Sequence, residues 1–252
     1  MQFFGGRAMV ELRRFRKSLW LLMTLSAISV AILNSRFILV DIHTIFHRAI
    51  DHLENEKFEL YLHLFTAPVL LVGGALLFFD RLPQRFPTVH RWGGRAYILT
   101  VLVTSIATLK MSLNETEGPL TVFGFAVLSI LWFVTAALAW LRAVQGRYAR
   151  HAEWMIRNYA LTLTNVTFRA ELHLSLWLGA DFDLIYEPLR SLQFVPNLLF
   201  AELLIQTAFF TSPNWRDLLR SDAYRRRRDR QLTSQPVREF SVQIPPGDSS
   251  SP

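Results

Sequence analysis

Long apolar stretches constrain this chain more than any other feature of its sequence. A helix that crosses a lipid bilayer needs about 20 mostly apolar residues. Six stretches of that kind are present, at 18–40, 60–79, 93–113, 121–144, 154–178 and 192–210. Inside lipid, a backbone satisfies its own hydrogen bonds only as a helix or a closed barrel. The sequence therefore predicts an all-α integral membrane protein, a six-helix transmembrane bundle.

The composition agrees with this class and excludes several others. Apolar residues make up 51% of the chain and charged residues 19%, against about 25% charged residues in soluble domains. There is no cysteine, which excludes a disulfide scaffold, iron–sulfur clusters, thiolate-ligated haem and cysteine nucleophiles.

The basic residues alternate between the connections and so indicate an orientation. Most of the 27 lysines and arginines lie in the N-terminal tail, the second and fourth connections and the C-terminal tail. Lys and Arg are enriched on the cytoplasmic side of membrane proteins. We therefore expect both the N and C termini to be cytoplasmic, in a multi-pass protein of the inner (plasma) membrane.

The same pattern divides the chain into three segments. Residues 1–17 form a cytoplasmic N-terminal tail, residues 18–212 the membrane domain, and residues 213–252 a basic tail rich in Ser and Pro. The last segment is predicted to be disordered and to meet anionic lipids through its arginines. Its arginine run at 225–228 is interpreted as a topology signal, so no nucleic-acid partner is expected.

An amphipathic extracytoplasmic helix is predicted at about 38–54, after the first apolar stretch. His43 and His47 lie four residues apart on its polar face. This spacing makes them a weak candidate pair for a divalent metal. A solvated polar face with no ligand is the other interpretation.

The stretch 154–178 contains polar residues that share one helical face. Taken at 100° per residue, the face holds Asn158, Thr162, Asn165, Arg169 and His173. Ionisable groups within a bilayer are costly, so such a face is expected to line the bundle interior or a wet cavity. Asn and Thr could also simply bond neighbouring helices.

Two residues of the last stretch complete the predicted intramembrane polar cluster. Asn197 and Glu202 lie within 192–210. Arg169 needs a partner, and Glu202 is at a similar predicted depth. We expect an Arg169–Glu202 pair in the outer half of the membrane.

Four histidines fall at two predicted levels. His63 and His173 lie near the outer surface, and His90 and His151 lie near the inner surface. One imidazole from each of two helices is the ligand set of bis-histidine haem b in helix bundles. Haem b is therefore a candidate cofactor at one or both levels. Interfacial hydrogen bonding and proton relay are the alternatives.

Three longer segments carry a family resemblance. They are 90–97 (HRWGGRAY), 150–161 (RHAEWMIRNYAL) and 195–202 (VPNLLFAE). With His63, they resemble a family of predicted bacterial membrane proteins known only as a domain of unknown function, over about residues 60–210. That resemblance implies the bundle and carries no activity.

The chain also resembles, more weakly, the transmembrane cytochromes b of the ascorbate-dependent ferrireductase type. Those are six-span bundles with histidine pairs at two levels, and His90 with His151 fits the inner pair. The outer pair departs from that pattern, because the stretch 121–144 has no histidine. An outer haem would need His63 to pair with His173.

Three functions are compatible with these features. The first is a haem b electron-transfer or quinone-linked redox protein. The second is a transporter or channel for a small solute or protons, although no interrupted pair of spans and no inverted repeat is evident. The third is a non-catalytic subunit that assembles with a membrane-protein partner. No catalytic residue set is recognisable, so the sequence does not say whether the chain is an enzyme.

Overall fold

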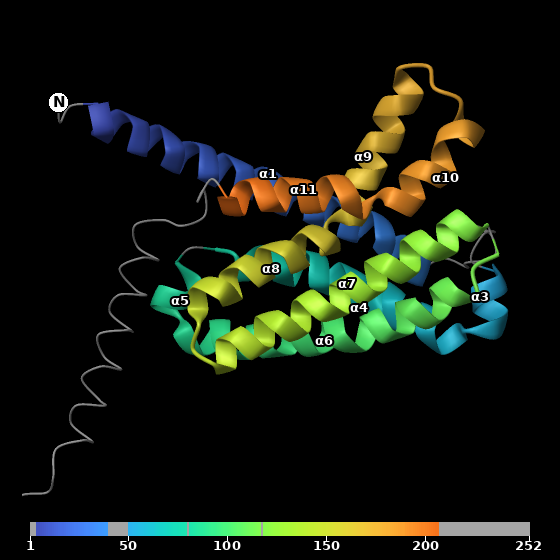
Figure 1. Cartoon of the computed structure of the whole chain (residues 1–252), viewed down its shortest axis with the longest axis horizontal. Helices are drawn as coiled ribbons and strands as arrows, with labels where there is room; N and C mark the ends of the chain where they lie inside the picture. The colour runs from blue at the N-terminus through green and yellow to red at the C-terminus, as the bar shows by residue number, and fades with distance from the viewer. Residues whose placement is uncertain (1–3, 40–49, 80, 117, 207–252) are drawn as a thin grey trace, which may run out of the picture. The chain divides into compact units, whose positions relative to one another are not determined.

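The computed structural model describes residues 4–39, 50–79, 81–116 and 118–206, and the elements it shows there are all helices (Figure 1). In chain order they are α1 (Phe4–Leu39), α3 (Ile50–Asn55), α4 (Lys57–Leu77), α5 (Leu82–Arg85), α6 (Pro87–Leu113), α7 (Pro119–Val144), α8 (Tyr148–Thr162), α9 (Thr164–Trp177), α10 (Phe182–Leu192) and α11 (Phe194–Gln206).

Four of these helices are long and apolar enough to cross a membrane. The spans are Lys17–Ser35 within α1, and the whole of α4, α6 and α7. The prediction of an all-α membrane protein is confirmed, whereas six spans are not confirmed by the described residues, which end at Gln206 within the last predicted stretch. The stretch 154–178 is divided between α8 and α9, and the last stretch contributes the 13-residue helix α11.

The core is a ring of four helices, α4, α6, α7 and α8. Each packs against the next in chain order, and α8 closes the ring on α4. The buried core side chains come from all four members; they include Leu70, Tyr97, Val101, Trp132, Ala136, Ala139, Met155 and Tyr159. Helix α1 packs outside α4, and α11 packs on α8. In this arrangement α6 and α8 face each other across the centre.

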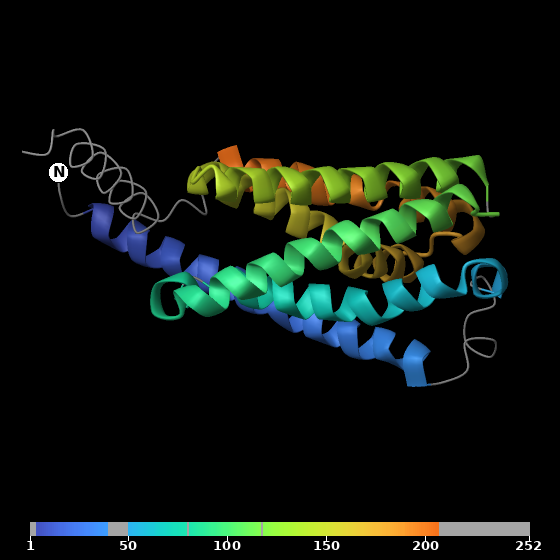
Figure 2. The same cartoon turned by 90° about the horizontal axis from the view of Figure 1, so that it is seen from below.

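The connections gather at two ends of the ring (Figures 1 and 2). Helix α5 and the turn between α7 and α8 lie at one end, which we call the arginine-rich end because Arg81, Arg85, Arg147 and Arg150 lie there. Helix α3 and the connection between α6 and α7 lie at the other, which we call the His52 end. The orientation of these ends across the membrane stays a prediction.

Helix α8 ends at Thr162 because the residues that follow favour other backbone partners. The run 162–167 reads TLTNVT, and Thr, Asn and Val are weak helix formers. The hydroxyl of Thr164 donates to the carbonyl of Leu161 at 2.8 Å, and that of Thr167 donates to the carbonyl of Thr164 at 3.0 Å. After Leu163 the chain leaves the ring as α9 (Figure 1).

A second break separates α10 from α11 at Gln193. Pro196 follows Leu192 by four residues, has no N–H to donate to the Leu192 carbonyl, and would clash with it in a continuous helix. Of the two breaks, the first interrupts the predicted stretch 154–178, whereas the second lies at the start of the stretch 192–210. The sequence contains a signal for each break: a run of Thr and Asn residues for the first and a proline for the second.

Of the predicted amphipathic helix at 38–54, the structure describes its beginning within α1 and its end as α3. His43 and His47 lie outside the described residues. The same is true of the basic C-terminal tail.

Candidate functional site

His90 and His151 lie at the arginine-rich end of the ring, on α6 and α8. His90 is in the first turn of α6 and His151 in the first turn of α8. Each lies seven residues, or two turns, before a residue that reaches across the ring, namely Tyr97 and Asn158. The Tyr97 hydroxyl donates to Oδ1 of Asn158 at 3.2 Å. Residues seven apart share a helix face. Both histidines therefore lie at one level, about 10 Å closer to the arginine-rich end than Tyr97 and Asn158 do.

The imidazole of His151 is oriented by the backbone of α7. Its Nδ1 lies 2.8 Å from the carbonyl oxygen of Ala139. A carbonyl only accepts, so Nδ1 carries the proton and Nε2 keeps its lone pair when the ring is neutral. Nδ1 of His90 is buried and has no hydrogen-bond partner among the described residues. The pair thus offers nitrogen atoms that the fold itself does not use.

Space and positive charge adjoin the two histidines. A Cβ added at Gly94, one turn after His90, would meet no atom within 4 Å. Nε of Arg142, one turn beyond Ala139, is buried without a partner in the described part of the chain, while its Nη1 donates to Gln145 at 2.9 Å. An open space and an unpartnered arginine nitrogen thus lie within one or two turns of the two histidines.

A polar network closes the site toward the middle of the ring. Asn158 is fully buried. Its amide donates to the Trp132 carbonyl at 3.0 Å and to the Thr135 hydroxyl at 2.9 Å. The hydroxyl of Thr162 binds the Tyr97 hydroxyl at 2.9 Å and accepts from the Trp132 indole at 3.0 Å. This half of the predicted polar face thus lies in the interior, where its groups bond neighbouring helices.

The other half of the predicted face lies beyond the break. Asn165, Arg169 and His173 belong to α9, which leaves the ring, and His173 is exposed. Asn197, in the first turn of α11, donates to the carbonyl of Ala160 at 2.9 Å. Ala160 is in the last turn of α8, where carbonyls lack a helical partner. Asn197 therefore joins the two breaks to each other.

Glu202 binds a different arginine from the one that the sequence suggested. Both of its carboxylate oxygens contact Arg157 of α8, at 2.5 Å from Nε and 3.0 Å from Nη2. The expected pair with Arg169 assumed one straight helix from 154 to 178, whereas α11 packs along α8. Arg157 also lies over the Trp154 ring, 4.6 Å from its centroid. The pair couples α11 to the helix that carries His151.

The two outer histidines lie in different surroundings. His63 is on α4, and its Nδ1 is buried with no hydrogen-bond partner among the described residues. His173 is on the surface of α9, where its Nδ1 lies 2.6 Å from the Arg169 carbonyl. The haem that was predicted to be held by both histidines stays a prediction. A buried position on α4 and an exposed position on α9 do not favour it. In the described ranges, no three His, Asp or Glu side chains are grouped closely enough to hold a metal ion.

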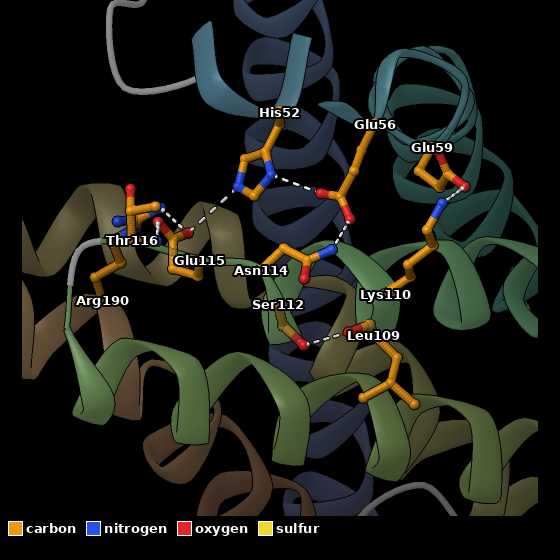
Figure 3. A network of polar contacts seen from close by, with 10 residues as sticks. All are labelled: His52, Glu56, Glu59, Leu109, Lys110, Ser112, Asn114, Glu115, Thr116 and Arg190. Atoms are coloured by element: carbon orange, nitrogen blue, oxygen red, sulfur yellow. Dashed lines mark hydrogen bonds and ion pairs between the residues drawn. The ribbon is translucent and has the colours of Figure 1, made fainter. Parts of the chain in front are cut away.

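A cluster of charged side chains at the His52 end was missed by sequence reasoning (Figure 3). His52 contacts Glu56 and Glu115, and Arg190 contacts Glu115. The spacing of four residues between His52 and Glu56 could have predicted their contact, because residues four apart lie on one helix face. Glu115 and Arg190 were not predictable partners, because they come from a connection and from α10, 75 residues apart.

Comparison with known proteins identifies a family and no activity. A family model described as "Predicted membrane protein (DUF2306)" matches residues 60–205. No curated protein and no solved structure matches the chain. The resemblance to a family of predicted membrane proteins is confirmed, whereas nothing in the comparisons supports the resemblance to the transmembrane cytochromes b.

Proposed function

Since the chain belongs to the DUF2306 family of predicted membrane proteins, whose description names no activity, we propose a function from the site itself. In this proposal His90 and His151 would hold the iron of a haem b between α6 and α8, and the haem would supply electron-transfer chemistry. The observation that carries this proposal is that His90 and His151 begin α6 and α8 at the same end of the ring, with the imidazole of His151 oriented through Nδ1 by the Ala139 carbonyl.

The surroundings of the pair suit a porphyrin. Neutral imidazole is a good iron ligand, and a backbone hydrogen bond at Nδ1 is the usual way to orient it. Ala136 and Ala139 of α7 are fully buried and small. The open space at Gly94 lies on the ligand face of α6. Arg142 could meet a propionate through its buried Nε.

The electron partner is proposed by class alone. The bundle lies in a lipid bilayer, and the exposed arginines Arg91, Arg95 and Arg150 surround the end nearest the histidines. We place this end at the cytoplasmic face of the inner membrane. A membrane quinone or a membrane-protein partner would exchange electrons with the haem there.

The test is the absorption spectrum of the full chain, purified after expression with adequate haem. The wild type is expected to show a Soret band, and His90→Ala and His151→Ala are each expected to lose it or shift it strongly. The matched control is His173→Ala, because His173 is exposed on α9. Added imidazole should restore the band of His151→Ala by filling the vacated position. If both ligand variants keep the wild-type spectrum, the assignment is wrong.

Transport of a small solute or of protons is the second candidate. It is supported by the two helix breaks that Asn197 joins, since discontinuous helices mark the substrate sites of many transporters. A wild type that binds no haem, together with solute or proton flux in vesicles that Asn197→Leu abolishes, would favour this candidate over haem binding.

A further inference from the structure

The charged cluster at the His52 end joins four separate parts of the chain (Figure 3). His52 comes from α3, Glu56 precedes α4, Asn114 and Glu115 lie in the connection between α6 and α7, and Arg190 comes from α10. The side chains of Glu56 and Glu115 are only 2% and 5% exposed. Charges that are this enclosed must be paired to be tolerated.

The geometry around His52 fits a doubly protonated ring. Nδ1 lies 2.8 Å from a carboxylate oxygen of Glu56, and Nε2 lies 3.6 Å from a carboxylate oxygen of Glu115. A neutral imidazole has one N–H and one lone pair. One nitrogen would then turn its lone pair toward a carboxylate, which is repulsive. Both contacts are favourable only in the imidazolium form.

The other charged groups nearby balance the two carboxylates. Nη2 of Arg190 lies 3.2 Å from Glu115, and its guanidinium packs over Phe125, 4.7 Å from the ring centroid. Asn114 donates to Glu56 at 2.5 Å. On the side of α4 and α6, Glu59 and Lys110 bind each other at 2.6 Å, while Glu54 on α3 is exposed. His52 is therefore the group in this cluster whose charge changes near neutral pH.

We propose that this cluster is a proton-sensing site: the proton bound by His52 holds α3 to the connection between α6 and α7, and its loss at rising pH loosens that contact. The site lies at the end of the ring opposite the histidine pair. It is independent of haem binding, since none of its residues takes part in the proposed haem site.

The direction of the pH response follows from the two partners. Contact with Glu115 raises the pKa of His52 above its ordinary 6.5, against the opposing effect of burial. The stabilisation from His52 is therefore complete below pH 6.5 and is lost as the pH rises through the raised pKa. Burial alone would raise the pKa of Glu115, but His52 and Arg190 lower it below 4.5. Its contribution is lost only as the pH falls through that lowered value.

The test compares thermal unfolding of the full chain in detergent at about pH 6 and about pH 9. The wild type is expected to melt several degrees lower at the higher pH. His52→Gln, which cannot take up a proton, is expected to flatten this difference. The matched control His173→Gln should keep the wild-type difference, because its side chain is exposed and its Nδ1 contacts a backbone carbonyl.

A second measurement covers the case in which His52→Gln does not fold. Histidine ¹⁵N resonances of the wild type, in protein labelled at histidine, report how many ring nitrogens carry a proton. One histidine is expected to stay doubly protonated above pH 6.5, and to titrate at lower pH in Glu115→Gln. If no histidine does so, or if Glu115→Gln leaves every titration unchanged, the proton-sensing site is disproved.

Discussion

At the scale of single residues, hydrogen bonds between buried side chains hold the centre of the ring. The Tyr97 hydroxyl contacts both Asn158 and Thr162, and each of these also bonds α7. Within a bilayer no water competes for such groups, so an unmade bond is costly. These contacts fix how α6 and α8 are rotated about their axes, and so set the helix faces on which His90 and His151 lie two turns earlier.

The Arg157–Glu202 pair gives a prediction at this scale. Arg157→Leu should lower the free energy of unfolding by about 1 kcal/mol, because it leaves the carboxylate of Glu202, whose side chain is 39% exposed, without its bidentate partner. The double change to Leu at both positions should recover part of the loss. The measurement is a double-mutant cycle by denaturant unfolding.

A control separates this pair from ordinary surface pairs. Arg150 contacts Glu153 at 3.2 Å, and the Arg150 side chain is 69% exposed. Arg150→Leu should cost at most about 0.5 kcal/mol. Additive effects of the Arg157 and Glu202 changes would show that the two residues do not interact.

Helical periodicity alone predicted part of the residue pattern. It placed Asn158 and Thr162 on an interior face, which is correct because α8 is regular up to Thr162. It failed for the partner of Glu202, since this contact depends on the break at Leu163 and on α11 packing along α8. Contacts between distant segments cannot be obtained from the spacing within one helix.

At the scale of elements, close packing of α10 on α7 fixes where the chain returns to the ring. A Cβ added at Gly124 of α7 would lie 2.1 Å from the backbone oxygen of Ser191. Backbone atoms cannot move away as a flexible side chain can. Glycine at this position therefore lets α10 approach α7 closely and sets the position of α11 beyond it.

This contact predicts opposite effects for two glycine substitutions in spans. Gly124→Ala should destabilise the protein by about 1–3 kcal/mol, because α10 must shift. Gly73→Ala in α4 should be neutral or stabilising by up to about 1 kcal/mol, because nothing lies within 4 Å of the added Cβ and alanine favours helix. Thermal unfolding of both variants checks this. Equal effects would mean that the approach of α10 to α7 does not matter.

The elements differ in how well the sequence predicts them. Apolar length was sufficient for α4, α6 and α7, since each is a continuous span. The stretch 154–178 is less apolar than those spans, because it contains Arg157, Arg169 and the Thr/Asn run that ends α8, and it is not among the helices long and apolar enough to cross a membrane. Pro196 marks the second break in the same way.

At the scale of the whole molecule, the connections give a topology prediction. Because helix α5 and the α7–α8 turn share the arginine-rich end, that end should face the cytoplasm. A reporter fused after Arg220 should read as cytoplasmic, and one fused near Asn55 as external. An external reading after Arg220 would contradict the orientation.

The sequence predicted the positions of the four histidines only in part. His90 and His151 begin their helices at the same end, which a count of spans gives directly. His63 and His173 also share a predicted level, but the departure of α9 from the ring puts His173 on the surface. We therefore propose one haem site, between α6 and α8, and not two.

The ratio of haem to protein in the purified wild type tests the proposed haem site between α6 and α8 most directly. Haem extracted from the full chain and measured as its pyridine complex should equal one per chain, and should fall close to zero in the double variant His90→Ala/His151→Ala. A wild type without haem, after expression with adequate haem, would contradict the proposed function. A ratio of two would contradict the single site between α6 and α8.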